Sequence, residues 1–185
     1  MIREALEWLA GRLPPPRVIM DRQGGSPYLS RYYLKGRPYM ADGSSPTDEM
    51  GELREGVIVP PGIGVYLHKF HRGDDDRALH NHPWMWARSL ILVGGYVEER
   101  RVSFPWDTAR YRVARRIVRA GAYNRIDADD FHRVELLEKD CWSLFIAGPK
   151  TGSWGFWDRV TNEFLHWRDF IAKTRGPAWE GKLSK

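Results

Sequence analysis

The sequence feature that most constrains this chain is a pair of histidines, His80 and His82, together with a third, His132, in a later segment. If residues 79–82 are extended, side chains two positions apart point to the same side of the strand. The two imidazoles then face one point, and a metal ion there needs at least one more ligand. His132 is the only histidine between positions 83 and 165. The sequence therefore predicts a metal site of three imidazoles, His80, His82 and His132.

Glycine and aspartate residues accompany these histidines: Gly94 after His82, and Gly121, Asp127 and Asp129 before His132. Their spacing resembles the two sequence motifs of the cupin family, with Ala87 where the first motif usually has a glutamate. The resemblance covers residues 57–150. It implies an all-β fold, the cupin double-stranded β-helix or jelly-roll barrel, with one metal ion in its interior.

We expect one domain with two extensions, because a chain of 185 residues is too short for two full domains. Residues 1–56 are predicted to form an N-terminal helix and loop extension, and residues 57–150 the barrel. Residues 151–185 are predicted to form a C-terminal strand and helix extension packed on the barrel. Apolar residues at helical spacing place the first helix in residues 2–12, where it packs on the barrel or makes a dimer contact.

Two turns are predicted to close β-hairpins. Gly94 and Gly95 follow the apolar run 89–93, and a charged turn at residues 138–140 separates two further strand-like runs. The segment 96–104, which follows the first turn, is rich in charge and is expected to face outward.

A narrower resemblance lies in three short runs, residues 124–127, 132–135 and 143–149. These runs resemble the thiol dioxygenases, of which cysteine dioxygenase is the familiar member. The resemblance implies Fe(II) held by three histidines without a carboxylate, and Ala87 at the glutamate position fits that scheme. Zn, Ni or Cu stay open, because imidazole binds each of them. Ala87 and Ala147 also stand where cysteine dioxygenase has its crosslinked cysteine and tyrosine, so cysteine is not implied as the substrate.

Several further residues are candidates for contact with a substrate: Tyr66, Arg88 and Tyr123 as catalytic residues, and Arg31, Trp84, Trp86 and Arg125 as substrate-binding residues. The resemblance implies that Arg31 binds a carboxylate of the substrate. Arg88 lies an even number of positions after His82, so it should point the same way if the strand stays regular after Pro83. Tyr123 or Arg125 would act similarly from the facing strand. For each side chain the alternative is a packing or surface role.

The other reactive side chains carry no predicted site. His68 and His71 are three positions apart, so on a strand they face opposite sides and neither is predicted to be a ligand. Cys141 is the single cysteine, which excludes an intramolecular disulfide, and it is expected to be buried on a strand.

The charge of the chain favours an anionic partner. The net charge is +5, and most of the 29 basic residues are arginine, the side chain best suited to bind carboxylate or phosphate. The arginine-rich run 110–119 is either the solvated face of a strand or a nucleic-acid patch, and no nucleic-acid-binding motif accompanies it. The N-terminus lacks the apolar stretch of a secretory signal, so a cytoplasmic location is expected, away from membranes. A homodimer is also open.

Three functions are open at this stage. The first is a non-heme Fe(II) dioxygenase that acts on a small anionic substrate at His80, His82 and His132. The second is a non-redox metal-dependent isomerase or lyase for a sugar, nucleotide or keto acid, with the metal as a Lewis acid. The third is a binding module without catalysis, whose arginines engage an anionic partner.

Overall fold

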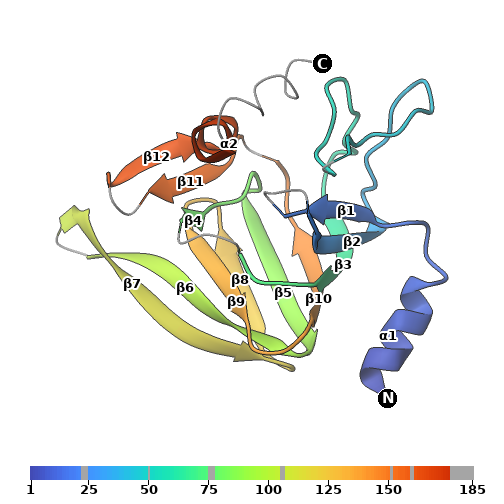
Figure 1. Cartoon of the computed structure of the whole chain (residues 1–185), viewed down its shortest axis with the longest axis horizontal. Coiled ribbons are helices and arrows are strands. Elements are labelled where there is room, and N and C mark those ends of the chain that lie inside the picture. The colour runs from blue at the N-terminus through green and yellow to red at the C-terminus, as the bar shows by residue number, and fades with distance from the viewer. Residues whose placement is uncertain are drawn as a thin grey trace.

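The computed structural model describes residues 1–21, 25–49, 51–74, 78–104, 107–150, 152–158 and 161–175. Strands dominate these residues, and a helix lies near each end (Figure 1). The elements are α1 (Ile2–Ala10), β1 (Arg17–Met20), β2 (Pro27–Lys35), β3 (Gly64–Phe70), β4 (Leu79–His80), β5 (Trp86–Val93), β6 (Gly95–Phe104), β7 (Asp107–Arg119), β8 (Tyr123–Asp127), β9 (His132–Leu136), β10 (Cys141–Ala147), β11 (Gly155–Asp158), β12 (Glu163–His166) and α2 (Trp167–Arg175).

The strands form two antiparallel sheets. The first sheet has the order β1-β2-β3-β10-β5-β8, and the second has the order β12-β11-β4-β9-β6-β7. One core cluster joins Ile91 and Cys141 of the first sheet to Tyr96, Val118 and Val134 of the second. The core therefore lies between the sheets, and the all-β jelly-roll fold predicted from the sequence is confirmed.

The flanking segments contribute strands to both sheets. From the N-terminal side, β1 and β2 extend the first sheet beyond β3. From the C-terminal side, β11 pairs with β4 and places Phe156 opposite His80. The segments before and after the central barrel strands therefore help to enclose the space between the sheets.

Neither predicted hairpin is present, because both turns connect the two sheets. β5 belongs to the first sheet and β6 to the second, and the chain passes between them at Gly94, whose φ of 74° is in the left-handed region. β9 and β10 are likewise in different sheets. Both turns are present at the predicted residues. The residue types that favour a turn are the same whether the next strand pairs in the same sheet or crosses to the other sheet.

The helix predicted in residues 2–12 is confirmed as α1. Its Ala10 is buried against Leu67 of β3 and Trp142 of β10, with Leu6 and Tyr32 packed beside them. Leu67 lies next to the inward-facing residues of β3, so α1 covers the outer face of the first sheet. At the other end of the described chain, α2 packs against β11 and β12 (Figure 1). Among the described residues, neither helix is long and apolar enough to cross a membrane.

Two glycines with similar backbone conformations allow a matched test of the β5 to β6 crossing. Gly94 and Gly121 both have positive φ, but a Cβ at Gly94 would collide with the backbone oxygen of Asp140, and a Cβ at Gly121 would meet nothing within 4 Å. Gly121→Ala should cost about 1–2 kcal/mol of unfolding free energy through backbone strain alone. Gly94→Ala should cost about 1–3 kcal/mol more, because the clash is added. Urea unfolding measures both, and equal losses would contradict the role of Gly94.

Candidate metal centre

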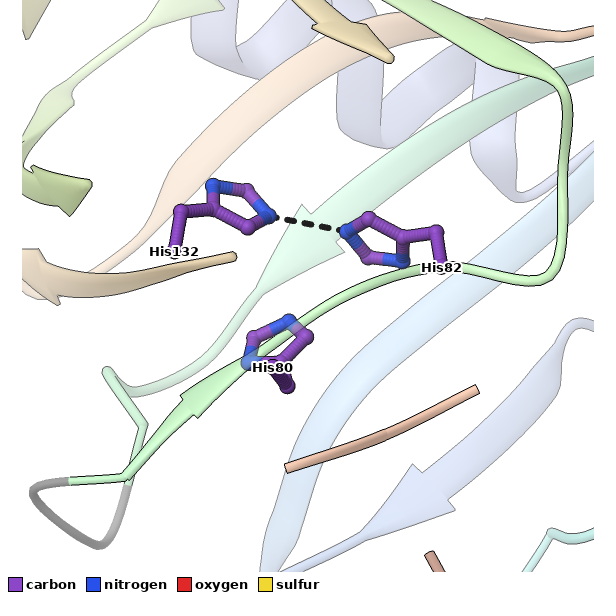
Figure 2. Close-up of side chains that lie close together, drawn as sticks. All are labelled: His80, His82 and His132. Carbon is purple, nitrogen blue, oxygen red and sulfur yellow. Dashed lines mark hydrogen bonds between the residues drawn. The ribbon is translucent and has the colours of Figure 1, made fainter. Parts of the chain in front are cut away.

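The three predicted ligands come together at the inner face of the second sheet. His80 in β4 and His132 in β9 are direct cross-strand neighbours. His82 follows two residues after His80, where β4 has already ended. One ligand atom from each ring lies within 4.8 Å of the others, and the three rings face a common point (Figure 2). The pairing of β4 with β9 thus supplies two ligands, and the chain leaving β4 supplies the third.

The donor set fits a divalent metal ion. His82 Nε2 and His132 Nε2 lie 2.8 Å apart. Two imidazole nitrogens bound to one tetrahedral ion at about 2.1 Å would be about 3.4 Å apart, so a shift of about half an ångström opens the pair to a metal. His80, His82 and His132 would hold the ion, and their three imidazoles leave at least one coordination position for water or substrate.

A fully buried carboxylate, Glu98 of β6, orients His132. Glu98 Oε1 accepts a hydrogen bond from His132 Nδ1 at 2.8 Å, and the side chain of Glu98 has no exposed surface. Because the carboxylate only accepts, the proton of His132 is on Nδ1, and the Nε2 lone pair faces the other rings. The three-histidine site therefore includes a carboxylate that is not itself a ligand.

The charge of Glu98 is satisfied by three further side chains. Arg100 Nη2 donates to Oε1 at 2.9 Å, Asn124 Nδ2 donates to Oε1 at 3.0 Å, and Arg116 Nε donates to Oε2 at 2.6 Å. Burial alone would raise the pKa of Glu98, but the hydrogen bonds from His132 and Asn124 and the charges of His132 and Arg100 outweigh it. They hold the pKa of Glu98 far below its ordinary value, so the group is ionised.

A second carboxylate lies beside His80. His80 Nδ1 is 4.0 Å from Asp74 Oδ2, and the other ring nitrogen of His80 points toward the two remaining rings (Figure 2). Asp74 is held by the hydroxyl of Tyr28 at 2.8 Å and by the backbone N–H of Val134 at 2.6 Å. The hydrogen bond to Glu98 therefore sets the ring orientation of His132, whereas Asp74 lies too far from His80 for a hydrogen bond and contributes a negative charge beside that ring.

His82 is held by packing. Its ring stacks on Trp84, with centroids 5.5 Å apart and an interplanar angle of 24°. Burial, followed by the nearby charges of His132, His80 and Arg31, lowers the pKa of His82 well below its ordinary value. The imidazole is therefore neutral at physiological pH, which is the form that binds a metal.

The histidines open into a cavity of about 380 Å³ between the two sheets. Its aromatic wall includes Tyr66, Trp84 and Phe145, and Tyr66 stacks on Phe145 with centroids 6.2 Å apart. The volume falls within the range of small-molecule sites. A small ligand in this cavity can therefore contact the three-histidine cluster and the aromatic wall together.

Arg31 of β2 also faces this cavity. Its Nε donates to His68 Nε2 at 2.9 Å, and its guanidinium carbon lies 5.0 Å from the ring of Tyr66 and 5.5 Å from the ring of Trp84. His68 must accept this bond, and burial followed by the charge of Arg31 lowers its pKa well below the ordinary value, so it is neutral. Among the described residues, no carboxylate pairs with Arg31, and the positive charge remains available to a ligand.

Four candidate residues point away from the cavity. Arg88 and Trp86 lie on the outer face of β5, where Arg88 pairs with Asp127 at 3.5 Å and packs over the ring of Trp86. Tyr123 and Arg125 lie on the outer face of β8, with Tyr123 exposed and Arg125 paired with Asp127 at 2.9 Å. We therefore do not include these four in the site, and the inward residues of β8 are Asn124 and Ile126.

The prediction for Arg88 required a regular strand after Pro83, and this condition is not met, because the alternation breaks there. Trp84 is buried and forms a bridge to Lys150, whereas Met85 is exposed. Inward-facing positions resume at Ala87, an odd number of residues after Trp84. The bend after Pro83 shifts the alternation of side chains by one residue. Residues an even number of positions after His82 therefore face outward in β5.

Sequence reasoning missed Glu98, His68, Arg17 and Lys150. Glu98 lies in a charged segment that was expected to face outward. It is two residues after the aromatic Tyr96, which is buried, so both side chains lie on the same face of the strand. That spacing was the available signal for an inward carboxylate. Arg17 and Lys150 line the cavity from segments outside the predicted motifs, and no local pattern marks them.

Comparisons with known proteins give distant likenesses of fold. No protein-family model matches the sequence, and no curated protein matches it. Among solved structures, KdgF from Halomonas sp. is similar at 13% identity and a TM-score of 0.40, covering 69% of this chain and 85% of that one. Recombinant oxalate oxidase in complex with glycolate is similar at 16% identity and a TM-score of 0.41, covering 66% and 61%. Fe(II)-HppE with (S)-1-HPP is similar at 10% identity and a TM-score of 0.44, covering 75% and 57%. Scores below 0.5 carry no argument about activity, which has to come from the site.

The role of Glu98 is testable by a single-atom change. Glu98→Gln keeps one acceptor for His132 but removes the charge, so the affinity for a divalent metal should fall about 10–100-fold. Glu99→Gln, on the opposite face of the same strand and paired with Arg115 at 3.4 Å, is the matched control and should bind metal as the wild type does. Competition with a chromophoric chelator measures both. Unchanged affinity in Glu98→Gln, with the fold intact by circular dichroism, would contradict the assignment.

Proposed function

We propose that this protein is a metal-dependent enzyme, a non-heme Fe(II) dioxygenase, that binds a small anionic substrate between the three-histidine cluster and Arg31. The observation that carries the proposal is the placement of three imidazoles and of Arg31, which pairs with no carboxylate among the described residues, on the same cavity. The location in the interior of the barrel also supports an enzyme that shields its substrate from water.

The charge of the donor set favours an anion. Three neutral imidazoles cancel none of the charge of a divalent ion, so a ligand that reaches the open position gains from being negative. Fe(II) in such a site would supply the activation of O2 beside a bound substrate. Zn, Ni and Cu are compatible with imidazole ligands as well, so the choice of Fe(II) rests on the resemblance to the thiol dioxygenases.

The chain's own residues would position the substrate. Arg31 would hold an anionic group, with its guanidinium oriented by the hydrogen bond to His68. Trp84 lies against both His82 and Arg31 and would exclude water from the path between them. Tyr66 lines the same cavity, with its hydroxyl beside Gly64, and burial raises the pKa of Tyr66, so the phenol stays protonated and would donate a hydrogen bond to a ligand that reaches it.

The acid–base inventory of the cavity favours oxidation over isomerisation or elimination. An isomerase or lyase needs a base within hydrogen-bond reach of the proton that it removes. Among the described residues that line the cavity, Glu52 is the one carboxylate, and it is paired with Arg17 at 3.1 Å. His68 is neutral, but its Nε2 already accepts the bond from Arg31. Neither Glu52 nor His68 is therefore free to take a proton, which supports a reaction that does not use a carboxylate or an imidazole as its base.

Metal content and oxygen uptake test this proposal together. Protein purified without chelator should contain about one metal ion per chain, and after anaerobic Fe(II) loading it should consume O2 with a small anionic substrate, for which thiols and aromatic acids form the screening panel. His82→Ala should lose both properties. His166→Ala, a histidine of β12 outside the cluster, is the matched control and should keep both.

The alternative functions give different results in the same assay. Stoichiometric zinc or nickel, with no oxygen uptake on Fe(II) loading, would replace the oxygenase by the non-redox enzyme. No bound metal in wild type before or after loading would remove the metal centre and leave a binding module, whose affinity for an anionic partner should survive His82→Ala.

A further inference from the structure

A group of cations forms one wall of the cavity described above. Arg17 of β1, Arg31 of β2 and Lys150, which follows β10, all line the cavity. Lys150 forms a β-bridge with Trp84, and the guanidinium of Arg31 lies 5.5 Å from the ring of the same tryptophan. Arg31 therefore lies beside Trp84, whose ring stacks on His82, and the backbone of Lys150 pairs with the same tryptophan.

The cations are close enough to repel one another. Burial lowers the pKa of Lys150, and the charges of Arg17 and Arg31 lower it further. Burial is also the largest cause that lowers the pKa of Arg31, and Arg17 acts in the same direction. Like charges held together in a partly desolvated wall cost free energy, and the chain keeps them there without a matching set of carboxylates.

The count of charges on this wall leaves two positive charges without a partner. Arg17 is neutralised by Glu52 at 3.1 Å and also donates to the backbone oxygen of Gly51. Arg31 is bonded to neutral His68, and among the described residues neither Arg31 nor Lys150 has a carboxylate within ion-pair distance. A ligand group with one negative charge would leave one of these two cations uncompensated, whereas a group with two negative charges would match both.

We propose that the wall formed by Arg17, Arg31 and Lys150 binds a dianionic phosphate-type group, so that the substrate is a small organic phosphate or phosphonate whose other end reaches the three histidines. The proposal deepens the function proposed above and rests on it for the role of the metal end. Arginine and lysine are the usual partners of phosphate, and Arg31 in β2 and Lys150 in the segment after β10 approach from different parts of the chain, which suits a tetrahedral group.

The rest of the ligand is constrained by the aromatic lining. Tyr33 packs edge-on against Tyr66 at 5.2 Å between centroids, and Trp84 continues this wall toward His82. Between the cations and the histidines, the ligand therefore contacts ring faces and edges. A planar or apolar body joined to the phosphate fits this lining, and an aryl phosphate has both parts.

Binding to the metal-free protein tests the phosphate site separately from the metal chemistry. Phenyl phosphate, benzoate and phenol share a ring and differ in charge, and a phosphate monoester with a second pKa of about 6 is dianionic at pH 8. In chelator-treated protein at that pH, calorimetry should give phenyl phosphate at least about tenfold tighter binding than benzoate, and phenol the weakest. Inorganic phosphate should bind more weakly than phenyl phosphate, because it lacks the ring.

Variants on the wall complete the test. Arg31→Met and Lys150→Met should each weaken phenyl phosphate about tenfold or more, while Arg125→Met, an exposed arginine on the outer face of β8, should leave it unchanged. If Arg31→Met unfolds, Lys150→Met decides, since Lys150 lies at the exposed end of the wall.

Three results would overturn the proposal. Equal affinity for benzoate and phenyl phosphate would make the wall a site for a single negative charge. If neither Arg31→Met nor Lys150→Met changes the affinity for phenyl phosphate, the anion binds elsewhere. If inorganic phosphate binds as tightly as phenyl phosphate, the ring does not contribute and the proposal of an organic phosphate substrate is contradicted. Each result leaves the metal content of the histidine cluster to be judged by its own measurement.

Discussion

The carboxylate of Glu98, buried with no exposed surface, is the constraint on which the site depends. A charge without water is costly unless each of its lone pairs is satisfied, so its partners must occupy fixed positions. His132 of β9 and Arg116 of β7 bind it within the second sheet, and Asn124 of β8 reaches it from the first. The same network therefore spaces the two sheets and fixes the ring of a metal ligand, which ties the fold to the chemistry.

Most of the metal centre could be predicted from sequence because its signals are local. His80 and His82 are two residues apart, and the segment before His132 has a recognisable spacing. Their convergence required only that two short segments meet, and β4 pairs with β9 at His80 and His132 themselves. The fold class was implied by the resemblance of this spacing to the cupin motifs. The orientation of the strand after Pro83 did not follow, because one inserted residue reverses the direction of every later side chain, Arg88 included.

The parts of the site that sequence reasoning missed depend on contacts between distant segments. A charged residue in a charged segment is normally exposed, and only the presence of Arg116, Asn124 and His132 around Glu98 makes its burial possible. The cations of the cavity wall come from β1, from β2 and from the segment after β10, so no window of sequence contains them together. The predictions of hairpins at residues 94–95 and 138–140 were wrong for a similar reason. Which strand pairs with which depends on contacts across the whole barrel and not on the turn residues alone.

The measurement that tests the central claim most directly is an anomalous-diffraction crystal structure of the metal-loaded protein, collected at the absorption edge of the bound metal. We expect one anomalous peak within bonding distance of His80, His82 and His132, with Glu98 still bonded to His132 Nδ1 and not to the metal. A peak at any other group of side chains, or a peak coordinated by Glu98 in place of one of the three histidines, would contradict it.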